Sequence, residues 1–311
     1  WVASVDSSSD MKVSMDNFAH TSETYRKIRN TLRFMLANTG DYNEAIDAVS
    51  YAELGSVDQY MLVRLSQVIK AVRDAYTAYD FATVVKTITQ FLTVDMSAFY
   101  LDFAKDVVYI EGEKSLARRR MQTVMYKALV DVVELLTPIL AFTAEEIWPL
   151  LKQERDFAAL ADFPEATGFT NQDDLLKAWP AFMAFRDKVQ KALEVARDAK
   201  VIGKSLEAHV TVYADDKLKA LLSGLDANLA QLLIVSDFTV KDATDAPADA
   251  QVVDDVKLEV VHAEGDVCDR CRMTTTDVGS DARYPHFCAR CAKIVSENFP
   301  ETAAADFEFE V

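Results

Sequence analysis

Long apolar runs, glycine and cysteine are all scarce in this sequence of 311 residues. No apolar run reaches the roughly 18 residues that a membrane-spanning helix needs, and no signal peptide opens the chain. Gly occurs only 8 times while 50% of the residues are hydrophobic, a composition typical of a largely helical, well-packed protein. The chain opens at Trp1 without an initiator Met, so we expect it to be a piece of a longer protein.

Sequence motifs of enzymes are also missing. There is no Gly-rich phosphate loop, no G-x-S-x-G elbow and no H-E-x-x-H pair. Only four histidines occur, and they fall on separate predicted elements: His20, His209, His262 and His286. Because no residue pattern could activate a nucleophile, we expect this chain to bind a partner rather than to act as a freestanding enzyme.

Basic residues are outnumbered, with 33 Lys and Arg against 50 Asp and Glu, which gives a formal net charge of -17. That balance argues against a general nucleic-acid coat protein. It does not exclude RNA binding, because counterion release depends on the charges at the contact and not on the sum over the molecule.

One local cluster of cations stands against this acidic background in the stretch YRKIRNTLRFML, residues 25–36. Apolar residues repeat there with the period of a helix, and Arg26, Arg29 and Arg33 follow one another at spacings of three and four, with Asn30 beside them. A basic helix face on an acidic protein indicates an acidic partner, of which a phosphate backbone is the commonest. A solvated helix face paired with acids elsewhere in the fold is the alternative.

A second cluster comprises Arg118, Arg119 and Arg120, in the first turns of a helix that Ser115 is predicted to cap. Cations near a helix N-terminus oppose the helix dipole. We therefore expect negative charge from outside the helix to offset them.

Hydrophobic periodicity predicts an up-and-down bundle of antiparallel helices, followed by a smaller mixed part. Residues 1–20 are predicted to be an extended lead-in, and helix caps are expected at Thr21 or Ser22, at Ser56 and at Thr143. After a polar stretch, a helix over 182–199 and one helix over 218–233 accompany predicted strands at 208–214, 233–240 and 256–263.

The four cysteines form two C-x-x-C pairs with sixteen residues between them: Cys268 and Cys271, then Cys288 and Cys291. This spacing is typical of a zinc ribbon, in which four thiolates surround one structural Zn²⁺. A reduced site without metal, an Fe–S cluster and redox use of one pair are the open alternatives. His286 lies nearby, but four thiolates already fill the coordination shell.

The predicted fold class is therefore mainly α, with a small α/β part. We expect an antiparallel helical bundle over 1–155, a linker over 156–181, a small α/β domain over 182–262 and a four-cysteine zinc-ribbon module over 263–311.

Seven stretches, taken in order, carry a resemblance over nearly the whole chain: WVASVD, YRKIRNTLRFML, SAFYLDFAKDVVY, SLARRRMQT, LLTPILAFTAEEIW, KVIGKSLEAHV and the C-x-x-C pairs. They are similar to the C-terminal part of bacterial isoleucyl-tRNA synthetases. Valyl, leucyl and methionyl relatives share the class I anticodon-binding bundle, so an equivalent fragment of one of them is an alternative. The α/β junction and zinc module favour the isoleucyl family. One departure is Arg272, which follows Cys271 where the family often has Trp.

The resemblance implies an enzyme that uses ATP to join isoleucine to its tRNA, with this piece gripping the anticodon arm. The family's H-x-G-H and K-M-S-K-S motifs do not occur here, so we expect the catalytic and editing domains upstream and this piece alone to be inactive. The resemblance also implies isoleucine-specific tRNA as partner, a cytoplasmic location, a monomeric state and no membrane.

The predicted tRNA contacts are Arg26, Arg29, Asn30, Arg33, Arg118, Arg119 and Arg120, with Lys200, Lys204, Arg270, Arg272 and Arg290 as secondary candidates. Phosphate contacts of this kind position an RNA, whose unstacked bases are then read at their edges. A zinc-stabilised helical scaffold that binds another protein is the alternative from a different functional class.

Overall fold

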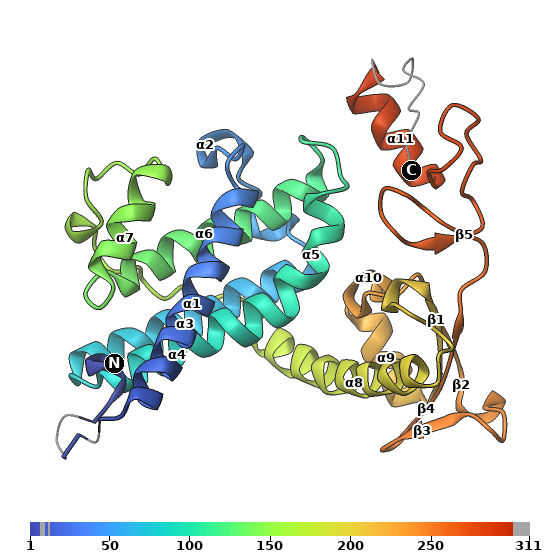
Figure 1. Ribbon diagram of the computed structural model, residues 1–311, viewed down its shortest axis with the longest axis horizontal. Helices are drawn as coiled ribbons and strands as arrows, with labels where there is room; N and C mark the ends of the chain where they lie inside the picture. The colour runs from blue at the N-terminus through green and yellow to red at the C-terminus, as the bar shows by residue number, and fades with distance from the viewer. Residues whose placement is uncertain (7–9, 12, 301–311) are drawn as a thin grey trace. The chain divides into compact units, whose positions relative to one another are not determined.

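The structure is a computed structural model, and it describes residues 1–6, 10, 11 and 13–300 (Figure 1). The chain forms two compact units, of which one comprises residues 1–104 and 119–173 and the other residues 105–118 and 174–311. The predicted fold class is confirmed, since helices dominate, a small sheet follows and the four cysteines gather together. None of the helices in the described ranges is long and apolar enough to cross a membrane.

Amphipathic helices that bury one apolar face each make up the first unit. They are α1 (Met15–Asn38), α2 (Glu44–Asp47), α3 (Ser56–Thr77), α4 (Phe81–Gln90), the start of α5 (Leu101–Val108), most of α6 (Leu116–Leu136) and α7 (Ala141–Ile147), with a wider π-helical stretch, Phe91–Tyr100, between α4 and α5. Side chains such as Trp148 and Tyr100 are fully buried between them. The hydroxyl of Tyr76 on α3 also donates to the carbonyl of Leu135 on α6 over 2.8 Å, which ties these helices together.

The first helix starts earlier than the sequence predicts. The expectation of an extended lead-in through residue 20 is wrong from Met15 onward. Ser14 caps the helix, because its hydroxyl accepts a hydrogen bond from the amide of Asn17 over 3.2 Å, and Asp16 follows in the first turn. These polar residues add almost three turns to α1 before the apolar stripe of residues 25–36.

Two other predicted helix caps, Ser56 and Thr143, are also wrong. Gly55, and not Ser56, precedes α3, and its amide donates to the carboxylate of Asp58 over 3.2 Å. Thr143 lies inside α7, and its hydroxyl is hydrogen-bonded to the hydroxyl of Tyr25 over 2.9 Å. At Thr143 a tertiary partner therefore takes the hydroxyl that the sequence assigned to capping, whereas at Ser56 the helix begins one residue earlier than predicted.

Asp58 is almost fully buried at the start of α3. Its other carboxylate oxygen accepts a hydrogen bond from the Tyr100 hydroxyl over 2.6 Å. Burial raises the pKa of Asp58 from 3.8 to about 6, against the lowering effect of that hydrogen bond.

The segment that follows the bundle packs back onto α3. The ring of Phe169 stacks on that of Tyr51 with 4.4 Å between their centroids, and the Tyr51 hydroxyl donates to Asn171 over 2.7 Å. Arg73 of α3 donates to the carbonyls of Phe163 and Pro164. Much of the stretch predicted as a linker is therefore held against the helical unit.

A four-stranded sheet and its helices form most of the second unit. The strands β1 (Ala208–Ala214), β2 (Asp237–Asp242), β3 (Gln251–Val253) and β4 (Val256–His262) lie in the order β2-β1-β4-β3, with β1 parallel to β2 and antiparallel to β4. The ring of Phe185, on α8 (Gln172–Asp198), lies 6.2 Å from that of Phe238 on β2.

Helix boundaries in this unit also differ from the prediction. The helix expected from residue 182 starts at Gln172. The single helix expected over 218–233 is wrong, because α9 (Asp216–Gly224) ends before Asn228, whose side chain caps α10 (Leu229–Leu233) by accepting from the amide of Gln231 over 3.2 Å.

Candidate zinc centre and nucleic-acid interface

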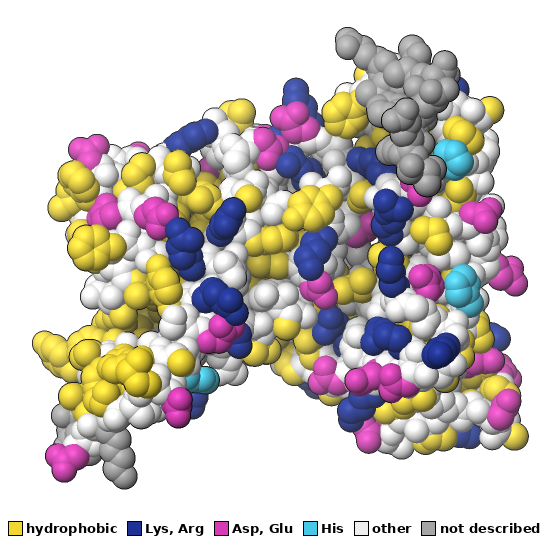
Figure 2. All heavy atoms as spheres, viewed as in Figure 1, with side chains coloured by type: hydrophobic (Ala, Val, Ile, Leu, Met, Phe, Trp, Pro, Cys, Tyr) yellow, Lys and Arg dark blue, Asp and Glu magenta, His cyan; other side chains and the backbone are white. Residues whose placement is uncertain are grey.

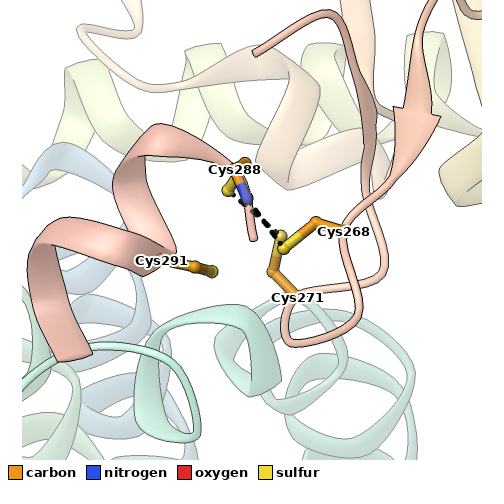
Figure 3. A group of neighbouring side chains, drawn as sticks. All are labelled: Cys268, Cys271, Cys288 and Cys291. Atoms are coloured by element: carbon orange, nitrogen blue, oxygen red, sulfur yellow. Dashed lines mark hydrogen bonds between the residues drawn. The ribbon is translucent and has the colours of Figure 1, made fainter. Parts of the chain in front are cut away.

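The four cysteines lie on a hairpin loop and at the start of a helix, both in the second unit. Cys268 and Cys271 occupy the loop between β5 (Asp266–Val267) and β6 (Thr274–Thr275), which pair as a short hairpin. Cys288 is the N-cap residue of α11 (Ala289–Asn298), and Cys291 follows in its first turn. Figure 3 shows the four side chains converging from the loop and from the helix.

The geometry of the sulfurs fits one tetrahedral metal ion. All four Sγ atoms lie within 4.8 Å of one another, and those of Cys271 and Cys288 are 3.8 Å apart. Zn–S bonds of about 2.3 Å in a tetrahedron place two sulfurs about 3.8 Å apart. The amide of Cys288 also donates to the Cys268 sulfur over 3.3 Å, an interaction that stabilises a thiolate. His286 is exposed and does not belong to the cluster.

Hydrogen bonds among these thiols shift their pKa values in opposite directions. Bonds from Cys271 and Cys291 lower the pKa of Cys268 far below its ordinary value. The hydrogen bonds that Cys271 and Cys291 make with Cys268 raise the pKa of each of these two thiols. A bound cation would favour the thiolate form of every ligand. Because four sulfurs close the coordination shell and leave no position for water or substrate, zinc here has a structural role.

The predicted basic stripe lies on the exposed side of α1. Ile28 and Leu32 are buried, whereas the side chain of Arg26 is 69% exposed and pairs with Glu23 of the same helix over 2.7 Å. Arg29 pairs with Glu146 of α7 over 2.7 Å. Asn30 and Arg33 are exposed, and the described residues offer no ion-pair partner to Arg33. Lys and Arg side chains gather over α1 on the face shown in Figure 2.

The second cluster does not form one face. Successive side chains on a helix are about 100° apart, so three consecutive arginines point in three directions. Arg118 is half-buried and donates to the carbonyls of Val108 and Glu113 over 3.3 and 3.2 Å.

Its neighbours turn toward the interior of the first unit. Arg119 is only 8% exposed and pairs with Asp41 and Asp47, each over 3.3 Å. Arg120 is half-buried, with an Nε atom that has no hydrogen-bond partner in the described part of the chain. The negative charge that offsets Arg119 therefore comes from the protein itself.

Three secondary candidates are exposed at turns of the second unit. Lys200 follows α8 with a positive φ of 60°, and Lys204 precedes a short turn closed by Glu207. Backbone amides of Gly203 and Lys204 lower the pKa of Glu207. Arg272, with φ 65°, pairs with Asp269 over 3.3 Å and keeps 65% of its side chain exposed.

Sequence reasoning missed Asp106 at the end of α5. The guanidinium of Arg290 donates to both of its carboxylate oxygens, over 2.6 and 2.9 Å. This contact joins residues 184 positions apart, and no local pattern around Asp106 indicates it. Arg290 is therefore engaged within the protein, although its sequence made it a secondary candidate for RNA contact.

Comparison with known proteins agrees with this arrangement. A family model described as "Anticodon-binding domain of tRNA ligase" matches residues 58–212, and "Zinc finger found in FPG and IleRS" matches residues 265–294. The chain is 60% identical to the isoleucine–tRNA ligase of Lacticaseibacillus casei over 99% of its own length, and 55% identical to those of Enterococcus faecalis and Streptococcus gordonii. The chain belongs to the isoleucine–tRNA ligase family.

It spans 33% of the length of each of these isoleucine–tRNA ligases. Within that third, the anticodon-binding match covers α3 through β1, and the zinc-finger match contains the whole cysteine cluster. The family match and the sulfur geometry together support one structural zinc ion held by Cys268, Cys271, Cys288 and Cys291.

Proposed function

We propose that this chain is the part of an isoleucine–tRNA ligase that binds the anticodon arm of isoleucine-specific tRNA. The observation that carries the proposal is the similarity to isoleucine–tRNA ligases over 99% of the chain, combined with the anticodon-binding match. The ligase reaction and its use of ATP belong to other parts of the whole protein, because the residues here include neither H-x-G-H nor K-M-S-K-S. That protein acts in the cytoplasm as a monomer.

The exposed face of α1 supports a role in positioning the RNA. Arg26, Arg29 and Arg33 present guanidinium groups that suit bidentate contact with phosphate oxygens, and Asn30 lies among them. The ion pairs of Arg26 with Glu23 and of Arg29 with Glu146 are exposed to water. Such pairs are worth about 0 to 1 kcal/mol, so an incoming phosphate can replace them at small cost.

The other candidate residues differ in how exposed their side chains are. Lys200, Lys204 and Arg272 are exposed and available as additional contacts from the second unit. Arg118 and Arg120 are half-buried, and Arg119 is buried with its charge already paired. We therefore assign phosphate binding first to α1 and give Arg119 a structural role.

A binding titration tests the proposal. The full chain, loaded with zinc, is titrated with an isoleucine tRNA and with the same tRNA carrying a replaced anticodon loop. We expect binding that weakens at least tenfold when the loop is replaced, because unstacked loop bases carry the sequence information. Equal affinity for both RNAs would refute recognition of the anticodon arm. Absence of binding to either RNA, with capture of a purified protein partner, would favour the interaction-scaffold alternative.

A further inference from the structure

Both C-x-x-C knuckles carry an arginine that reaches out of the zinc module, either to the end of α5 or to the residues just after it. Arg290 makes its bidentate contact with Asp106, and Arg270 donates to the carbonyl of Ile110 over 2.6 Å. Asp106 and Ile110 belong to the segment 105–118, which is part of the same compact unit as the zinc module. One short segment of chain therefore holds both knuckles.

The same two guanidinium groups lie beside the cysteine cluster. Arg270 donates to the sulfur of Cys291 over 3.8 Å. Arg290 directly precedes Cys291 in the first turn of α11, where its bidentate contact with Asp106 holds the guanidinium in place. The side chain of Ile110 is buried in one apolar cluster with the four cysteines and Ile294.

The positive charges of Arg270 and Arg290 can balance the negative charge of the zinc-bound thiolates. Four thiolates around one Zn²⁺ carry about two formal negative charges in excess. A buried excess charge is unfavourable unless it is paired, and two guanidinium groups at the cluster supply the matching positive charge. Each guanidinium is held in place by an acceptor on the α5 side, the Asp106 carboxylate for Arg290 and the Ile110 carbonyl for Arg270.

We propose that residues 106–110, at the end of α5 and just after it, are the outer support of the zinc centre. The Asp106 carboxylate orients Arg290 and the Ile110 carbonyl orients Arg270, so that both charges stabilise the thiolate cluster. Asp106 acts through Arg290 and is a positioning residue. Gln231 on α10 also donates to Asp106 over 3.1 Å, which makes the sheet-bearing part of the unit a member of the same support. This inference goes beyond the proposed function, because it concerns metal retention and does not depend on RNA.

Zinc affinity of the full chain tests the support directly. The dissociation constant is measured by competition with a chromophoric chelator for wild type, Asp106→Asn and a matched control. The control is Asp281→Asn, since Asp281 pairs with Arg283 of the same module over 2.6 Å, the distance of the Asp106–Arg290 pair. Loss of an outer-shell partner typically weakens metal binding about 10- to 100-fold, which we expect for Asp106→Asn and not for Asp281→Asn. Equal zinc affinity of Asp106→Asn and wild type would overturn the proposal.

A charge swap separates support of the metal from simple docking. Asp106→Arg combined with Arg290→Asp can restore the ion pair, but it puts a carboxylate where the guanidinium lies beside the thiolates. We expect zinc affinity at least as weak as in Asp106→Asn, together with an altered thiolate-to-metal charge-transfer band of the Co²⁺-substituted chain. Restoration of wild-type affinity and spectrum by the swap would show that Asp106 only docks the module. Thermal melting of the helices in each variant confirms that the rest of the chain is folded.

Discussion

Replacement of Arg119 by Ala should destabilise the helical unit without removing a contact to RNA. The guanidinium is 8% exposed, pairs with Asp41 and Asp47 over 3.3 Å each, and donates to the side chain of Gln122 over 2.7 Å. Gln122 is itself fully buried and donates to Asp41. The substitution therefore leaves two carboxylates and a buried amide without their common partner.

The magnitude follows from the burial of these partners. Removing one member of a buried ion pair costs about 3 to 5 kcal/mol, because the remaining charge has lost its partner. The side chains of Asp41 and Asp47 are 31% and 18% exposed, so water screens part of the free-energy cost of leaving these carboxylates without Arg119. We expect the free energy of unfolding to fall by about 2 to 3 kcal/mol after this discount.

Urea unfolding followed by circular dichroism measures this loss, with Arg33→Ala as the exposed control expected to change stability by less than about 0.5 kcal/mol. RNA binding by the folded protein should respond in the opposite way, with an effect of Arg33→Ala and none of Arg119→Ala. The slope of log affinity against log salt should fall by about 0.7 to 0.9 for Arg33→Ala and stay unchanged for Arg119→Ala. Wild-type stability of Arg119→Ala together with a reduced salt slope would refute the structural role.

Three further predictions concern the metal, a buried carboxyl and a hairpin glycine. Zinc removal by a chelator should expose the amides of residues 265–294 to hydrogen exchange while those of α3 stay protected, because this short module depends on metal to fold. The pKa of Asp58 rises from 3.8 to about 6 on folding, so its stabilising contribution is complete below pH 3.8 and is lost as pH rises through 6. Asp58→Asn should accordingly remove up to about 3 kcal/mol of pH dependence from urea unfolding between pH 4 and 7. Gly265→Ala should lower zinc retention at least severalfold in chelator competition. Gly265 has a φ of 102°, and a Cβ on it would lie 2.3 Å from the backbone of Thr275. The control Gly168→Ala places its Cβ in open space and should leave zinc retention unchanged.

Features encoded by short-range patterns could be predicted from the sequence. Alternating apolar residues placed β1 at its observed bounds, Ala208–Ala214. Ser115 was predicted to cap a helix, and its hydroxyl accepts from the amide of Arg118 over 3.2 Å. The spacing of the cysteines placed all four in one cluster. In each case the interacting groups are close in sequence or are strong ligands with a defined spacing.

Features set by distant partners could not be predicted in this way. The cations of α1 and of α6 look alike in sequence, yet Arg33 is exposed while Arg119 is enclosed by acids about 80 residues away in the chain. Arg290 resembles a surface cation until Asp106 is placed beside it. The charge of a residue can be read from the sequence, but its availability to RNA depends on which acids the fold brings near it.

The salt dependence of tRNA binding tests the central claim, that exposed cations of α1 hold the RNA, most directly. Arg29→Ala/Arg33→Ala is compared with the control Lys70→Ala/Lys191→Ala, which removes two cations that are also exposed, at 71% and 62%. We expect the α1 variant to lower the slope of log affinity against log salt by about 1.4 to 1.8, and the control to leave it unchanged. The same slope and affinity in both variants as in wild type would contradict it.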